Sequence, residues 1–191
     1  MNEMWKNKKK KTPAQIMRDL ISGDSYVFLD AEGNPNANPE ALLKGLESEN
    51  EVVRCRAAGH PNATPEVLMR AVGDECVYVR RLAAEHRNAT AEVLMKAVGD
   101  ESAFVREAAA SHRNATPEVL MGAVEDESAF VQGGAARNPN IKKLDIPIEK
   151  WLELVADGRF VGFIKNIPAR VKRDPRYKDM VLLRKLSPTD S

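Results

Sequence analysis

The chain has 191 residues, of which 43% are hydrophobic, 30% are charged and 5% are aromatic, and its formal net charge is +1 at pH 7. This is ordinary globular usage, and no apolar run approaches the ~18 residues of a membrane span, so we expect no membrane partner. The amino-terminal MNEMWKNKKKK has no apolar segment after it, which argues against a secretory signal. The two cysteines, Cys55 and Cys76, form no motif, and we expect a cytoplasmic location.

A segment of about 26 residues recurs along the chain. Three clear copies begin at His60, His86 and His112, a fourth begins at Asn34, and a degenerate copy precedes it. A fixed period of this length is the signature of a stacked array of small units, with atypical units at its ends. We therefore divide the chain into a basic amino-terminal tail (1–11), five repeats (12–33, 34–59, 60–85, 86–111 and 112–137), a divergent capping repeat (138–166) and a basic carboxyl-terminal tail or cap (167–191).

Each repeat is predicted to form two short helices. The first helix follows a threonine N-cap, and two copies have proline at the first helical position, where its missing N–H costs nothing. This helix is expected to end near Gly73 or Gly99. The second helix is expected to begin after a serine or aspartate N-cap, with Ser48 and Glu51 forming a capping box. The N-cap columns are Thr64, Thr90 and Thr116 for the first helix, and Ser22, Ser48, Asp74, Asp100 and Asp126 for the second.

Apolar spacing predicts which helix faces are buried. In the first helix, Leu68, Ala71 and Val72 follow one another at spacings of three and four residues, which gives one apolar stripe. In the second helix we expect an aromatic residue, the valine after it and a pair of alanines to be buried. These second-helix columns are Tyr78 or Phe104, Val79 or Val105, and Ala83–Ala84 or Ala109–Ala110.

The NPN or RNAT opening, the Pro-Glu-x-Leu helix and the Val-Arg of the second helix resemble the leucine-rich repeat variant family, over about residues 12–166. The Asp-x5-Arg spacing, as in Asp74 to Arg80, also resembles the second helix of HEAT repeats. The resemblance implies a right-handed superhelix with alternating α- and 3₁₀-type helices. An iron–sulfur cluster known in that family does not carry over, because no cysteine precedes Cys55. We predict an all-α fold, a right-handed α-solenoid of about five to six two-helix repeats.

A column of arginines on the second helix has two interpretations. In HEAT-like arrays an arginine at this position commonly bonds an aspartate of the neighbouring repeat. The aspartates of this chain are able to form such a ladder of arginine–aspartate bonds between repeats. Alternatively, the arginines bind a phosphate or carboxylate of a partner, because the planar guanidinium suits either. The column is Arg54, Arg80 and Arg106, ending in Gln132, and the aspartates are Asp74, Asp100 and Asp126.

The first helix carries a second basic column, for which two interpretations also remain. A glutamate stands four residues before each basic residue, which favours local ion pairs on a solvated face. The alternative is a polar recognition strip. The basic residues are Arg18, Lys44, Arg70 and Lys96, ending in Gly122, and the glutamates are Glu40, Glu66 and Glu92. Both basic columns end in the same repeat, where Gly133–Gly134 is expected to loosen the second helix by roughly 1 kcal/mol per glycine, so that either the binding strip ends or the array flexes there.

The histidines His60, His86 and His112 recur at one repeat position, which raises the question of a metal site. Equivalent residues of stacked helices lie roughly 8–10 Å apart, whereas one zinc ion needs donors about 2 Å away. We therefore expect these histidines, like Asn34 and Asn138 in the same column, to bond the turn between repeats. No metal and no cofactor is predicted.

Charge is distributed unevenly along the chain. Residues 1–12 carry five lysines and one acidic residue, and residues 159–191 carry nine basic and three acidic residues, so the chain between them is acidic. A surface that wraps nucleic acid needs basic residues along its length, whereas the chain between the two basic ends is acidic. We expect a non-catalytic scaffold that binds a protein or peptide along the solenoid surface, with a monomer as the default. The alternative is a nucleic-acid-binding HEAT-like module that uses the arginine column and the basic termini. No catalytic constellation is visible, so we do not expect an enzyme.

Overall fold

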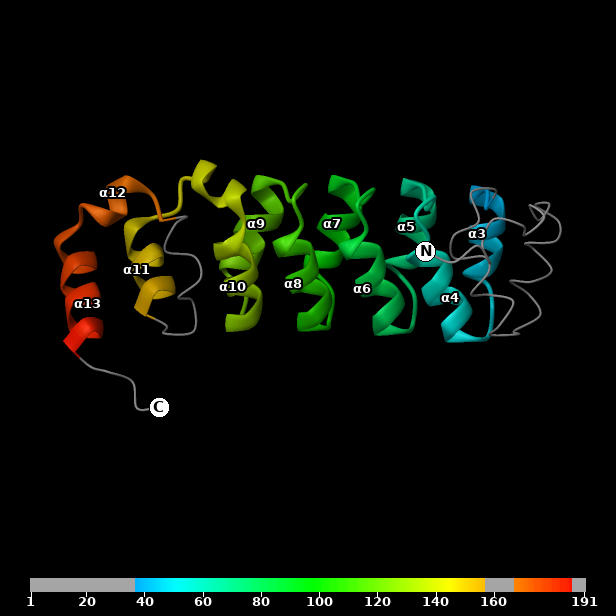
Figure 1. Cartoon of the computed structure of the whole chain (residues 1–191), viewed down its shortest axis with the longest axis horizontal. Coiled ribbons are helices and arrows are strands. Elements are labelled where there is room, and N and C mark those ends of the chain that lie inside the picture. The colour runs from blue at the N-terminus through cyan, green and yellow to red at the C-terminus, as the bar shows by residue number, and fades with distance from the viewer. Residues whose placement is uncertain (1–36, 157–166, 187–191) are drawn as a thin grey trace, which may run out of the picture. The chain divides into compact units, whose positions relative to one another are not determined.

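The computed structural model describes residues 37–156 and 167–186. These residues form eleven α-helices and one 3₁₀ helix without any strand, which confirms the all-α class and agrees with a helical repeat array (Figure 1). The chain divides after Ala97 into two compact units, which we describe separately. The tail 1–11, the degenerate repeat 12–33, Asn34 and residues 157–166 of the capping repeat lie outside the described residues. The right-handed sense and the total number of repeats stay predictions.

The first unit contains two complete helix pairs and the first helix of a third. The equivalent helices α3 and α5 pack against each other, as do α4 and α6, so the repeats stack in two layers (Figure 1). The elements are α3 (Pro39–Gly45), α4 (Glu51–Ala58), α5 (Pro65–Ala71), α6 (Val77–Glu85) and α7 (Ala91–Val98), whose last residue falls in the second unit.

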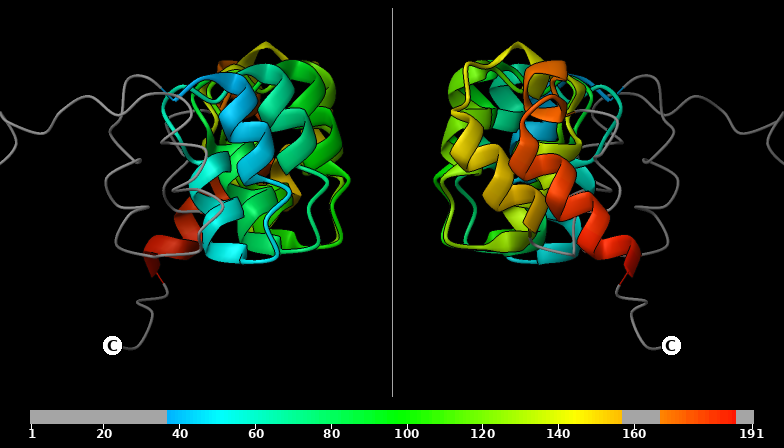
Figure 2. Two further views of the ribbon diagram at one scale, coloured as in Figure 1. Left: turned by 90° about the vertical axis from the view of Figure 1, so that its right-hand side faces the viewer. Right: turned by 90° about the vertical axis from the view of Figure 1, so that its left-hand side faces the viewer.

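The second unit continues the repeat pattern and then departs from it. Helix α8 packs against α9 and α10. Helix α11 packs against α10, α12 and α13, and Figure 2 shows α13 beside it. The elements are α8 (Ala103–Ser111), α9 (Pro117–Val124), α10 (Ala129–Arg137), the 3₁₀ helix η2 (Pro139–Lys143), α11 (Ile148–Ala156), α12 (Ala169–Lys172) and α13 (Pro175–Leu186). The segment 167–186 is therefore helical. The resemblance implied alternating α- and 3₁₀-type helices, whereas each described regular repeat pairs two α-helices.

The core consists of aliphatic columns, as the sequence predicts. Leucine, valine and alanine of the first helices and valine with paired alanines of the second helices are almost completely buried. Burying such side chains contributes on the order of 1.5–3 kcal/mol for each valine or leucine. The main columns are Leu42, Leu68, Leu94 and Leu120, Val53, Val79, Val105 and Val131, and Ala57–Ala58, Ala83–Ala84, Ala109–Ala110 and Ala135–Ala136. Trp151 fills the core of the divergent region.

The prediction that Tyr78 or Phe104 is buried is wrong. These side chains are 65% and 60% exposed, and the equivalent Phe130 is 47% exposed. The cause is helical phase. The buried stripe of α6 consists of Val79–Arg80 and Ala83–Ala84, and at about 100° per residue Tyr78 points to the opposite side of the helix.

The threonine N-caps are confirmed, but the second helices begin two residues later than predicted. The Oγ1 atoms of Thr64, Thr90 and Thr116 accept hydrogen bonds from the backbone N–H three residues later. The predicted aspartate caps instead accept a bond from the backbone N–H two residues on, before the helix starts. The predicted capping box is wrong, because Ser48 accepts from the Asn50 backbone. The N-caps of the second helices are Asn50, Cys76, Ser102 and Ser128.

The glycine pair of α10 does not interrupt that helix. Helix α10 continues from Ala129 to Arg137 with both glycines buried. A Cβ on Gly134 would lie 3.0 Å from Ser111 Oγ and 3.1 Å from Glu107 Cγ of α8. The missing side chain therefore allows close packing of α8 and α10.

None of the helices in the described part of the chain is long and apolar enough to cross a membrane.

Candidate functional site

Arg54 connects two neighbouring repeats of the first unit. Its Nε donates to both carboxylate oxygens of Asp74, at 3.2 and 2.9 Å, and its Nη2 donates to Glu75 Oε1 at 2.9 Å. Its Nη1 donates to the carbonyls of Ser48 and Glu49 in its own repeat. The side chain is only 7% exposed, and the bond to Asp74 raises the pKa of the guanidinium, which stays charged. Arg54 thus joins its own loop to the next one.

Arg106 repeats this arrangement in the second unit. Its Nε and Nη2 donate to Asp126 at 2.7 and 3.1 Å, and its Nη1 donates to the carbonyls of Asp100 and Glu101. The bond to Asp126 raises its pKa too. The predicted arginine–aspartate ladder is confirmed for Arg54 and Arg106. Arg80 is 7% exposed and donates to the carbonyls of Asp74 and Glu75.

Gln132 shows why the arginine column ends. Its Nε2 donates to the Asp126 carbonyl, which reproduces the bond that Arg106 makes within its own repeat. The shorter glutamine side chain does not reach a carboxylate in the following repeat. That repeat also lacks the aspartate, since the residue one period after Asp126 is Leu152. The change from arginine to glutamine therefore accompanies the end of the regular repeats.

The histidine column bonds the turns between repeats, as predicted. The Nδ1 atoms of His60, His86 and His112 each accept from the backbone N–H two residues later. In this geometry the proton is on Nε2, and His86 Nε2 lies 3.0 Å from the His60 carbonyl, to which it donates. Asn138 copies both contacts with its amide, accepting from the Asn140 N–H and donating to the His112 carbonyl.

The asparagine of the RNAT motif forms a second tie between repeats, which sequence reasoning missed. The side chains of Asn62 and Asn88 donate to carbonyls of Ala37 and Ala63 in the preceding repeat. Asn140 does the same to Ala115 in the second unit. The recurring asparagine two residues after the histidine was the available signal.

The predicted ion pairs of the first helices are wrong. Lys44 pairs with Glu47, three residues later, and this bond lowers the pKa of the Glu47 carboxyl. Within the described residues, neither Arg70 nor Lys96 forms an ion pair with the glutamate four residues before it. Lys96 extends over the end of α5, since a Cβ on Gly73 would lie 2.8 Å from its Nζ.

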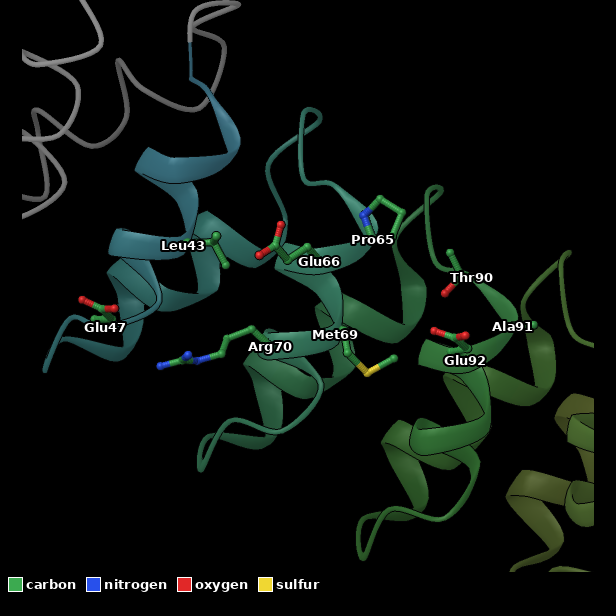
Figure 3. Close-up of a pocket in the computed structure, with 9 residues that line it drawn as sticks. All are labelled: Leu43, Glu47, Pro65, Glu66, Met69, Arg70, Thr90, Ala91 and Glu92. Atoms are coloured by element: carbon green, nitrogen blue, oxygen red, sulfur yellow. The ribbon is translucent and has the colours of Figure 1, made fainter.

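An open groove of about 830 Å³ crosses the first helices of three successive repeats in the first unit. Its apolar part is formed by Leu43 and Met69, and Figure 3 shows Met69 between Arg70 and Glu92, with Arg70 extending toward Glu47. Three carboxylates and one guanidinium surround it. The lining residues are Leu43, Glu47, Pro65, Glu66, Met69, Arg70, Thr90, Ala91 and Glu92.

Six arginine and lysine residues were proposed from the sequence as partner-binding candidates, and of these Arg70 lines the groove. Lys44 of α3 and Lys96 of α7 are not among its lining residues. The other three candidates lie on second helices: Arg54, Arg80 and Arg106. The apolar residues of the groove were missed. Their signal was a leucine or methionine column at the repeat period, namely Leu43, Met69, Met95 and Met121.

Cys55 and Cys76 are the free cysteines of the described residues. Burial, followed by the neighbouring Cys76, raises the pKa of the Cys55 thiol to about 11, so it is almost entirely protonated at neutral pH. In residues 37–156 and 167–186 no three histidine, cysteine, aspartate or glutamate side chains form a group that could hold a metal ion. Trp151 is buried and lines no open cleft.

Comparison with family models, with curated proteins and with solved structures finds no match to this chain. The resemblance to the leucine-rich repeat variant family stays a prediction.

Proposed function

We propose that this chain is a non-catalytic repeat scaffold whose first helices hold an extended segment of a partner protein. The groove over α3, α5 and α7 is the observation that carries the proposal. It is open, spans three repeats and combines apolar side chains with charges. Stacked repeats typically present extended surfaces of this kind to peptides.

The groove defines the chemistry of its partner. An apolar side chain would rest on Leu43 and Met69, and methionine adapts its shape to different ligands. Basic side chains would pair with Glu66 and Glu92. An acidic side chain would pair with Arg70, whose guanidinium offers two parallel donors. The best ligand is thus an apolar residue flanked by basic residues, with one acid beside them.

Nucleic acid receives less support as the ligand. Three carboxylates in the groove oppose a single arginine, and phosphate affinity depends on neutralising cations. Arg54 and Arg106, which the nucleic-acid alternative requires, already bind carboxylates inside the molecule. These two guanidinium groups are therefore engaged within the molecule.

Selection from a library of random peptides displayed on phage tests the proposal. We expect wild-type protein to enrich peptides with an apolar residue flanked by lysine or arginine, and Met69→Lys with Glu92→Lys to lose them, because these changes remove the apolar contact and repel basic side chains. Lys142→Glu, an exposed change on η2, is the matched control and should keep the same peptides. Failure to enrich any peptide, or equal binding by the groove variant, would contradict the proposal. Sub-micromolar binding of duplex DNA or RNA at ~150 mM salt would favour the nucleic-acid alternative.

A further inference from the structure

The second helices expose apolar side chains at one fixed repeat position. Among the described residues five large hydrophobic side chains are exposed, and four of them stand one period apart. Singly scattered exposed hydrophobic residues are normal, but recurrence at one position is not scatter. We call these four residues the aromatic column: Val52, Tyr78, Phe104 and Phe130.

Internal packing does not account for this column. In the second unit the rings of Phe104 and Phe130 meet edge to face, with centroids 5.8 Å apart and an interplanar angle of 67°. They nevertheless remain 60% and 47% exposed. A ring whose sole role is to join repeats would bury most of its surface, as the alanine pairs of the same helices do. The open ring surfaces are therefore available to a ligand.

Negative charge accompanies the aromatic column. A glutamate stands three residues before each of its members, and Glu75 and Glu127 have side chains 83% and 91% exposed. Glu75 also accepts from Arg54 at 2.9 Å, and Glu127 lies 3.6 Å from Arg106. The buried arginines thus hold these carboxylates just before the second helices. The acidic column is Glu49, Glu75, Glu101 and Glu127.

We propose that the part of these columns that lies in the second unit, Phe104 and Phe130 with Glu101 and Glu127, forms a docking surface for a basic amphipathic helix of another protein. Charge complementarity selects a partner with lysine and arginine, which also interact favourably with aromatic faces. The ring spacing fits a helical partner. Two residues four apart on an α-helix are separated by about 6 Å along its axis, which matches the 5.8 Å between the Phe104 and Phe130 rings.

This surface is separate from the groove of the proposed function. The groove is formed by first helices, whereas the columns lie on and just before second helices. Either surface can fail without the other.

Two synthetic helical peptides provide the test. One repeats leucine at three- and four-residue spacing with lysine elsewhere, and the other replaces every lysine by glutamate. Fluorescence anisotropy of the labelled peptides at ~150 mM salt measures binding to the full chain. We expect the lysine peptide to bind, the glutamate peptide not to bind, and the affinity of the lysine peptide to fall as salt rises.

Variants locate the binding. Phe104→Ser with Phe130→Ser should weaken the lysine peptide at least ~10-fold, as expected for anchoring aromatic residues. Glu101→Gln with Glu127→Gln should weaken it and flatten the salt dependence. Lys142→Gln, an exposed change on η2 outside both surfaces, should change it less than ~2-fold, and circular dichroism verifies that each variant folds.

Binding of the glutamate peptide as tightly as the lysine peptide, or an unchanged affinity in the double phenylalanine variant, would overturn the proposal. So would the absence of peptide binding together with self-association that the double phenylalanine variant abolishes in sedimentation, because the occupant would then be a second copy of the chain.

Discussion

The arginine column and the aromatic column lie two residues apart on the same helices and have opposite environments. On α6, Arg80 is 7% exposed and Tyr78 is 65% exposed. The charged residue is buried because its helix face meets the neighbouring helices and because nearby carbonyls accept hydrogen bonds from its guanidinium. The aromatic residue is exposed because it lies on the other face. Helical phase and available partners decide burial here, and hydrophobicity alone does not.

Removing an arginine of this column should have the largest effect on stability. Arg106→Gln keeps a group able to donate to the Asp100 carbonyl, as Gln132 does one repeat later, but loses both bonds to Asp126. We expect the free energy of unfolding to fall by about 1.5–3 kcal/mol, the usual contribution of charged hydrogen bonds. Chemical denaturation followed by circular dichroism measures it.

Arg70→Gln is the matched control for this change. The same chemical substitution at an exposed arginine, for which the described residues hold no ion pair, should alter stability by less than about 0.5 kcal/mol. Equal losses at both positions would mean that the burial of Arg106 contributes nothing specific.

Truncating the aromatic column should cost less than breaking the arginine column. Phe104→Ser removes the edge-to-face contact with Phe130 and some partly exposed surface. The expected loss is about 0.5–1.5 kcal/mol, the range of such ring pairs. Thermal denaturation beside Arg106→Gln gives the comparison. A larger loss for Phe104→Ser would show that the ring mainly stabilises the repeats.

A glycine on a first helix should respond in the opposite direction. Gly122 is exposed in α9, and a Cβ there would have its nearest contact at 3.9 Å, from Val98 Cγ2. Gly122→Ala should therefore raise stability by about 0.5–1 kcal/mol through helix propensity. The same denaturation measurement checks it, and a decrease would mean that the glycine has a packing role.

The smallest expected effect concerns the histidine column and its response to pH. Burial lowers the pKa of His86, which outweighs the opposing hydrogen bond to the His60 carbonyl. The unfolded chain thus binds a proton more readily. The stabilisation by neutral His86 is present above a pH of about 6.5 and is lost as the pH falls through the lower folded pKa.

His86→Asn isolates this effect, because Asn138 makes both of the equivalent contacts without titrating. Melting temperatures between pH 7 and pH 5 should fall more steeply for wild type than for the variant. Parallel curves would show that His86 contributes nothing to the pH dependence.

The fold was largely predictable from the sequence because the repeat period aligns equivalent residues. Thr64 and Leu68 showed where the first helix begins and which face it buries. The alanine pair also contained the correct phase of the second helix, since Ala83 and Ala84 stand four residues after Val79 and Arg80. Hydrophobicity made Tyr78 a competing candidate for the core, and that choice was wrong.

The surfaces were harder to predict than the fold. Arg54 and Asp74 are 20 residues apart, and only the stacking of repeats brings them together. The groove depends on three helices, so the recurrence of Leu43 and Met69 indicates a column but not a cavity. The ion pairs of the first helices were predicted from spacing alone. In the structure Lys44 forms its ion pair with Glu47 and not with Glu40.

The arginine column holds neighbouring repeats together through the bonds of Arg54 and Arg106 to aspartates of the next repeat. A double-mutant cycle on Arg106→Gln and Asp126→Asn in chemical denaturation tests it most directly, because asparagine keeps an oxygen able to accept from the Ser128 N–H. We predict that the two changes are not additive and that the coupling free energy is about 1–2 kcal/mol. Additive effects with no coupling, or single variants as stable as wild type, would contradict the claim and return the arginine column to the candidates for partner binding.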